Sequence, residues 1–173
     1  MEETDYYEKY PCRIVLFTGF FSLAVYGLGA FLMYWLGLVW LGLYILYVIW
    51  LELRLLKTSC VKCYYYGKIC AFGKGKLSSL LFNQQTPGSL AEEKITWKHL
   101  IPDMLVAFIP VVAGVIRLII YFELIILGVV VLLLFFSSLG SGFLRGNLAC
   151  RYCRQRETGC PAEQLFKRGD TKG

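Results

Sequence analysis

The chain has 173 residues, of which 57% are hydrophobic and only 17% are charged, and its mean hydropathy is +0.57. Average soluble domains carry about 25% charged residues, so this composition excludes an ordinary soluble domain. The formal net charge is +6, from 18 lysines and arginines against 12 acidic residues, and the placement of these basic residues carries information about orientation.

The apolar residues are gathered into four blocks, and each block is close to the ~20 residues that a helix needs to cross a bilayer. The four predicted membrane spans are Ile14 to Tyr34, Leu36 to Leu56, Ile101 to Ile120, and Phe122 to Leu144. Very short turns separate the first span from the second and the third from the fourth, so each pair is predicted to form a helical hairpin. The sequence therefore predicts an all-α integral membrane protein built as a four-helix transmembrane bundle.

The basic residues give the orientation of this bundle. With four spans, the N-terminal segment, the connection between Lys57 and Leu100, and the tail from Arg145 onward share one side. All lysines and arginines except Arg117 lie in these segments or at the span ends next to them. The positive-inside rule places that side in the cytoplasm. We therefore expect a multi-pass protein of the cell (cytoplasmic) membrane with both termini cytoplasmic.

Six of the seven cysteines form two triplets with one spacing, a Cys-x-x-Cys followed by six residues and a third Cys. The triplets are Cys60, Cys63 and Cys70, and Cys150, Cys153 and Cys160. Each triplet follows one predicted hairpin, which indicates two parallel repeats related by a pseudo-twofold axis along the membrane normal. The predicted organisation is a first repeat (1–70), a cytoplasmic interfacial linker (71–100), a second repeat (101–160) and a cytoplasmic tail (161–173).

Cytoplasmic thiols are normally kept reduced, so a disulfide framework is disfavoured, and soft thiolate ligands favour a metal cluster. Structural zinc is tetrahedral, and six thiolates can supply two zinc ions with four ligands each if two of the sulfurs bridge. We therefore predict that Cys60, Cys63, Cys70, Cys150, Cys153 and Cys160 bind zinc, with two ions as the expected number. Cys12 lies outside the set, and Gly67 and Gly159 are expected to permit the turns before each third cysteine.

Each triplet resembles one half of the binuclear zinc–cysteine cluster of fungal transcription factors. The matching segments are Cys60-Val-Lys-Cys63-Tyr-Tyr-Tyr-Gly-Lys-Ile-Cys70 and Cys150-Arg-Tyr-Cys153-Arg-Gln-Arg-Glu-Thr-Gly-Cys160. The resemblance implies that the first cysteine of each half, Cys60 and Cys150, is the bridging ligand. In that family a short linker joins the halves, whereas membrane helices separate them here. The resemblance therefore gives no reason to infer DNA binding, and no nucleic-acid partner is expected.

The main functional hypothesis is a zinc cluster that clips the two hairpins together and presents a basic surface to a cytoplasmic protein or to anionic lipid headgroups. The alternative is a membrane redox or sulfur-chemistry protein that uses an iron–sulfur cluster or reactive thiols. A small transporter is the third hypothesis, for which the sequence shows no evident polar cluster at mid-membrane. The only histidine is His99 and no nucleophile–His–acid set is present, so catalytic residues are unknown and the sequence favours a non-enzymatic role.

Four further residues carry local expectations. Glu52 is expected to face the bundle or the metal site, because charge within a span is costly unless it faces the protein interior. Lys74 and Lys76 are expected to contact lipid headgroups. Pro110 is expected to kink the third span or to free a backbone carbonyl inside the bundle.

Overall fold

The computed structural model describes residues 6–84, 97–139 and 148–156, and this part of the chain is helical without a β-strand. One isolated parallel bridge pairs Tyr7 with Cys153. The α-helices are α1 (Cys12–Leu36), α2 (Leu38–Thr58), α3 (Lys74–Leu81), α4 (Trp97–Ile120) and α5 (Leu124–Leu139), with short 3₁₀ turns at η1 (Cys60–Lys62) and η4 (Arg154–Arg156).

Three helical segments are long and apolar enough to cross a membrane: Cys12–Leu36, Leu38–Lys62 and Ile101–Ile120. They confirm the first three predicted spans to within a few residues and indicate a membrane protein. The described part of the fourth is a shorter apolar helix, Leu124–Ser138. Its predicted end, residues 140–144, lies outside the described residues, so the full length of the fourth span stays a prediction.

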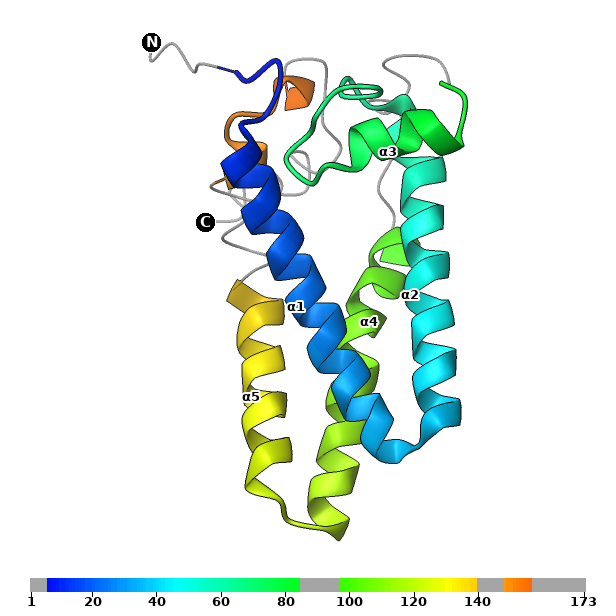
Figure 1. The fold of residues 1–173 in the computed structure, drawn as a ribbon, viewed down its shortest axis with the longest axis vertical. Coiled ribbons are helices and arrows are strands. Elements are labelled where there is room, and N and C mark those ends of the chain that lie inside the picture. The colour runs from blue at the N-terminus through cyan, green and yellow to red at the C-terminus, as the bar shows by residue number, and fades with distance from the viewer. Residues whose placement is uncertain (1–5, 85–96, 140–147, 157–173) are drawn as a thin grey trace.

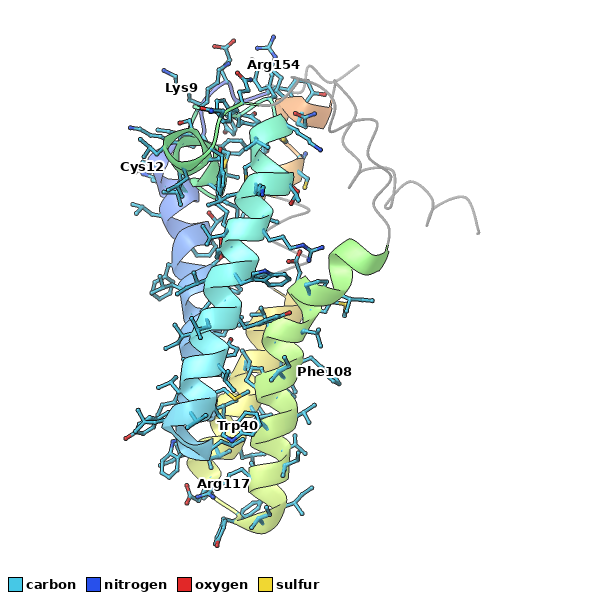
Figure 2. All side chains as sticks on the ribbon, turned by 90° about the vertical axis from the view of Figure 1, so that its right-hand side faces the viewer. Lys9, Cys12, Trp40, Phe108, Arg117 and Arg154 are labelled. Carbon is cyan, nitrogen blue, oxygen red and sulfur yellow. The ribbon has the colours of Figure 1, made fainter. Side chains whose placement is uncertain are left out.

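The outer surface of these helices agrees with a membrane environment. Large apolar side chains on three different helices are mostly exposed, including Leu23 (73%), Ile119 (79%) and Leu124 (76%). Apolar side chains project from the helices along their length, whereas Lys9 and Arg154 lie at one end and Arg117 at the other (Figure 2). Such an apolar belt between polar ends is the surface that a bilayer covers.

A single residue joins α1 to α2. Gly37 has φ 131°, a backbone conformation that side-chain-bearing residues rarely adopt, and its N–H donates to the Tyr34 carbonyl at 3.1 Å. The Gly37 carbonyl accepts from the Leu41 N–H at 3.1 Å, so the next helix begins at once. This reversal makes the hairpin that the sequence predicts at this point.

Helix α1 packs against α2, α4 and α5, and α4 packs against α5 and α2 (Figure 1). One buried cluster joins Leu32 of α1 to Ile126, Val130 and Leu133 of α5. The turns at Gly37 and between α4 and α5 lie at one end of the helices (Figure 1). The described N-terminal residues and the loop between α2 and α3 lie at the other end, as the hairpin prediction requires. Equivalence of the two hairpins as sequence repeats stays a prediction.

Pro110 lies inside α4 and frees a carbonyl, as expected from the sequence. Proline has no N–H, so the carbonyl of Val106, four residues earlier, lacks its helical donor. The Tyr44 hydroxyl of α2 donates to that carbonyl at 3.1 Å. Tyr44 is only 5% exposed, and Gly29 of α1 leaves the space that its ring occupies. A side chain from a neighbouring helix thus replaces the missing backbone donor.

Because Tyr44 replaces the backbone donor that Pro110 lacks, the effects of substituting these two residues on the free energy of unfolding should be coupled. Tyr44→Phe should lower the free energy of unfolding by about 1–3 kcal/mol, because it leaves the Val106 carbonyl buried without a donor. In a Pro110→Ala background the helical N–H returns, so the same Tyr44→Phe change should cost clearly less. Denaturation of all four proteins in one detergent measures the coupling, with Tyr34→Phe, at a tyrosine that is 58% exposed, as the control. An equal loss of unfolding free energy from Tyr44→Phe in the wild-type and Pro110→Ala proteins would contradict the coupling.

Candidate functional site

The first cysteine triplet lies in the loop between α2 and α3, and backbone turns fix its shape. The 3₁₀ turn η1 begins at Cys60, and the Cys63 N–H donates to the Cys60 carbonyl at 3.4 Å. Gly67 has φ 72°, which confirms the predicted turn before the third cysteine. The Gly75 N–H donates to the Cys70 sulfur at 3.3 Å. A donor aimed at sulfur stabilises thiolate character, which metal ligation requires.

Gly75 allows this loop to close upon the start of α3. Its carbonyl accepts from the Gly67 N–H at 3.0 Å. A Cβ at position 75 would collide with the backbone carbonyls of Tyr65 and Lys68, so only glycine fits at this close approach. No sequence pattern predicts this role of Gly75.

The described part of the second triplet has the same local turn. The Cys153 N–H donates to the Cys150 carbonyl at 3.3 Å, matching the bond within the first Cys-x-x-Cys. Cys160 and the predicted Gly159 turn lie outside the described residues. Cys12, at the start of α1, is exposed.

Two buried tyrosines join the N-terminal segment to both cysteine loops. The Tyr10 hydroxyl donates to the Ala149 carbonyl, and the Tyr65 hydroxyl donates to the Tyr7 carbonyl, both at 2.5 Å. The Tyr10 and Tyr65 rings pack with centroids 5.5 Å apart. The Tyr7 N–H donates to the Tyr152 carbonyl at 3.2 Å. We call the assembly of residues 6–11, 59–73 and 148–155 the cap.

Further bonds link the first loop directly to the second. The Arg154 N–H donates to the Tyr65 hydroxyl at 3.1 Å, and the Tyr64 N–H donates to Gln155 Oε1 at 2.7 Å. The Arg154 guanidinium also pairs with Glu8 at 2.8 Å and lies over the Tyr64 ring at 5.4 Å. Segments far apart in the sequence are therefore held together at this end of the helices.

The cap brings three of the six predicted ligands against one buried core. Cys63, Cys70 and Cys153 all pack against the cluster formed by Tyr10, Tyr65, Ala71 and Ala149. Cys60 lies within electrostatic range of Cys63 and Cys70. Among the described residues, no three His, Cys, Asp or Glu side chains converge closely enough to hold a metal ion as they stand, and no two cysteines form a disulfide.

Burial of the cap tyrosines alters their acidity. Removal from water raises the pKa of Tyr65 to about 12, and the neighbouring Cys153 and Cys63 act in the same direction, whereas the hydrogen bond from the Arg154 N–H opposes them. Burial also raises the pKa of Tyr10, with Cys153, Tyr65 and Cys150 adding to the effect. Both phenols thus remain donors to their carbonyl partners at neutral pH.

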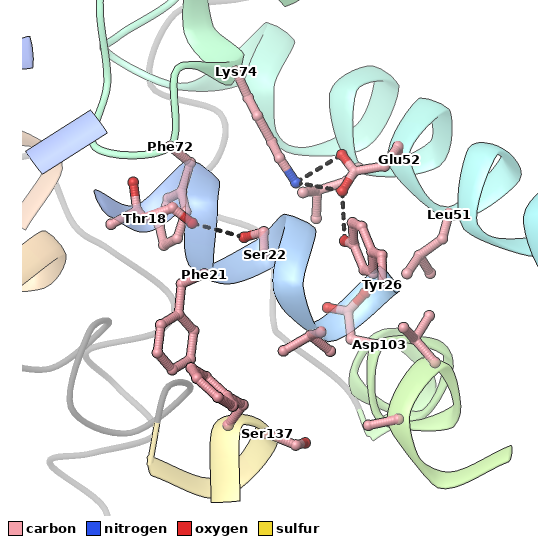
Figure 3. A pocket seen from close by; sticks show the side chains of 15 residues that line it. Thr18, Phe21, Ser22, Tyr26, Leu51, Glu52, Phe72, Lys74, Asp103 and Ser137 are labelled. Carbon is pink, nitrogen blue, oxygen red and sulfur yellow. Dashed lines mark hydrogen bonds and ion pairs between the residues drawn. The ribbon is translucent and has the colours of Figure 1, made fainter. Parts of the chain in front are cut away.

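A second feature is a polar pocket below the cap, which no sequence pattern predicts (Figure 3). Glu52 faces the interior, as expected. Lys74, which was expected to contact lipid headgroups, instead pairs with Glu52. Lys74 Nζ lies 2.8 and 2.7 Å from the two Glu52 carboxylate oxygens, and the Tyr26 hydroxyl donates to Glu52 Oε1 at 2.6 Å. Asp103 of α4 lines the same pocket. The residues that line the pocket are far apart in the sequence. Only Glu52, as a charged residue within a predicted span, was expected to face the interior.

No family model, no curated protein and no solved structure matches this chain. Any statement of function therefore rests on the residues themselves.

The raised pKa of Tyr65 predicts how stability responds to alkali. The pKa of Tyr65 in the folded protein lies above the ordinary value of about 10. The contribution of the protonated Tyr65 hydroxyl to the free energy of unfolding is therefore complete below pH 10 and is lost as the pH rises towards 12. Tyr65→Phe should be less stable than the wild type by about 1–3 kcal/mol at pH 7, since it loses two hydrogen bonds. The difference should shrink between pH 10 and 12. Thermal denaturation of both proteins across that range measures it, and a constant difference would contradict the prediction.

Proposed function

We propose that this chain is a four-span membrane protein whose two cysteine loops bind zinc at the cytoplasmic face. In this proposal the metal fastens the loop after α2 to the segment after α5. The cap then presents a basic surface to a cytoplasmic protein or to anionic lipid headgroups. The role is structural rather than catalytic.

The observation that carries the proposal is the packing of both cysteine loops around Tyr10 and Tyr65. The two loops follow different hairpins, so chain connectivity does not bring them together. They nevertheless lie in contact with each other and with the N-terminal segment through hydrogen bonds. Tyr65 lies within electrostatic range of Cys63 and Cys153, one from each triplet. The matching Cys-x-x-Cys turns and the N–H donated to the Cys70 sulfur are suited to thiolate ligands.

The charge around the loops also suits a thiolate cluster. Six thiolates and two divalent zinc ions leave about two negative charges, and uncompensated charge at a partly buried site is costly. Lys68 and Arg154 both lie over the Tyr64 ring between the loops, at 4.3 and 5.4 Å from its centroid. In this proposal the positive charge of Lys68 offsets the cluster, whereas Arg154 shares its charge with Glu8.

Metal binding requires the sulfurs to reach about 2.3 Å from zinc. In the proposal, Cys60, Cys63 and Cys70 approach Cys150 and Cys153 at the rim of the tyrosine core, and Cys160 completes the set. The free energy of metal binding then adds to the stability of the cap.

Metal analysis tests this assignment. We expect two zinc ions per chain in protein purified under reducing, anaerobic conditions, measured by native mass spectrometry. Cys60→Ser should lose metal because it removes a bridging ligand, whereas Cys12→Ser, at the exposed cysteine outside the set, should keep both ions. A metal-free wild type, or unchanged metal in Cys60→Ser, would refute the zinc site. A brown protein containing iron would favour the redox alternative.

Thiol labelling tests the orientation. A membrane-impermeant maleimide applied to intact cells should fail to label the native cysteines, including the exposed Cys12, and should label Cys12 after permeabilisation. Tyr121→Cys, at a 57% exposed position in the turn between α4 and α5, should be labelled from outside without permeabilisation. Labelling of Cys12 in intact cells together with protection of Tyr121→Cys would reverse the orientation.

A further inference from the structure

Helix α3 lies across the end of the bundle, whereas the apolar helices run along it. It runs crosswise to the membrane helices in Figure 1 and is seen nearly end-on in Figure 2. It packs against α2 and η1, and Gly73, just before it, lies close to the Val15 side chain of α1. A helix that lies crosswise where membrane spans end is in the position of the bilayer interface.

This helix has one buried face and one exposed apolar face. Gly75 and Ser78 are buried against the protein. Leu77, Leu80 and Leu81 are 47%, 76% and 53% exposed. Residues three and four positions apart lie on the same side of a helix, so these three leucines form a single surface, which we call the leucine face.

Contacts at both ends hold the leucine face outward. At the start of α3, Gly75 packs closely against the carbonyls of Tyr65 and Lys68. Just after its end, the Tyr66 hydroxyl donates to the Phe82 carbonyl at 2.7 Å. The helix is thus fixed to the first cysteine loop, with its leucines directed away from the protein. Such an apolar surface is unfavourable in water and is stabilised by transfer into hydrocarbon.

Two exposed lysines accompany this apolar surface. Lys76 belongs to α3, and Lys57 lies in the last turn of α2, against which α3 packs. In the described part of the chain, neither lysine forms an ion pair. The sequence from position 53 to position 84 has no acidic residue. Lysine charges beside an apolar helix face favour an anionic lipid surface, because the stems follow the hydrocarbon while the ammonium groups reach the headgroups.

We propose that α3 is an interfacial helix that inserts its leucine face into the adjoining leaflet and binds anionic phospholipid headgroups through Lys57 and Lys76. The partner of this surface is therefore the lipid bilayer and not a cytoplasmic protein. This inference rests on the membrane placement and cytoplasmic orientation in the proposed function, since the cytoplasmic leaflet carries the anionic lipid. It uses no cysteine and does not depend on zinc.

Photo-crosslinking of the full chain tests the lipid contact. The photoreactive residue p-benzoylphenylalanine replaces Leu80, and the protein is irradiated in nanodiscs of equal parts phosphatidylcholine and phosphatidylglycerol with matched acyl chains. Mass spectrometry should show lipid adducts in which the anionic phosphatidylglycerol exceeds phosphatidylcholine about twofold or more. The same probe at Leu23, which is 73% exposed within the first span, should give adducts near the ratio of the mixture. Absence of lipid adducts at Leu80, or the same ratio at both positions, would overturn the proposal.

Charge substitutions locate the headgroup contact. Lys57→Gln combined with Lys76→Gln should keep the lipid adducts at Leu80 and bring their ratio to that of the mixture. Lys9→Gln, at an exposed lysine of the N-terminal segment, should leave the ratio unchanged. An unaltered ratio in the double variant, or a protein adduct in place of lipid when the Leu80 probe is irradiated in intact cells, would refute this surface. Zinc is measured in the same samples, so a failure of the metal site is recorded separately.

Discussion

A backbone carbonyl that is removed from water needs a hydrogen-bond donor, and in this protein tyrosine hydroxyls repeatedly supply it. An unsatisfied buried acceptor costs about 1–3 kcal/mol, so each pairing constrains the packing of two segments. Within the helices, Tyr44 and Tyr47 of α2 donate to carbonyls of α4. In the cap and beside it, three further tyrosines do the same. The five donors and acceptors are Tyr10 to Ala149, Tyr44 to Val106, Tyr47 to Pro102, Tyr65 to Tyr7, and Tyr66 to Phe82.

The same requirement anchors the cap to the helices. The Thr18 hydroxyl of α1 lies 2.5 Å from the carbonyl of Ala71 and is almost fully buried. This contact fixes the loop that follows Cys70 directly over the helical bundle. The next residues, including Phe72, then roof the polar pocket. The cysteine loop and the roof of the pocket are therefore neighbouring parts of one continuous segment.

The sequence predicted the features that depend on local chain properties. Apolar length predicted four spans, of which three are confirmed. The glycine before Cys70 predicted the Gly67 turn, and the missing N–H of Pro110 predicted the freed carbonyl. It could not reveal that Tyr44 satisfies that carbonyl or that Lys74 reaches Glu52, because both contacts depend on which helices and loops pack together. The zinc site stays a prediction, since the spacing of the cysteines defines candidate ligands while their convergence depends on the tertiary packing and on Cys160, which lies outside the described residues.

The short segment from Cys70 to Gly75 connects the first cysteine loop to the polar pocket. Cys70 accepts the N–H of Gly75 at its sulfur, and Lys74, between them, holds Glu52. Gly75 is itself packed closely against the Tyr65 and Lys68 carbonyls, so the start of α3 is held against the first cysteine loop. The first cysteine loop and the Glu52–Lys74 pair are thus joined through a few residues of backbone.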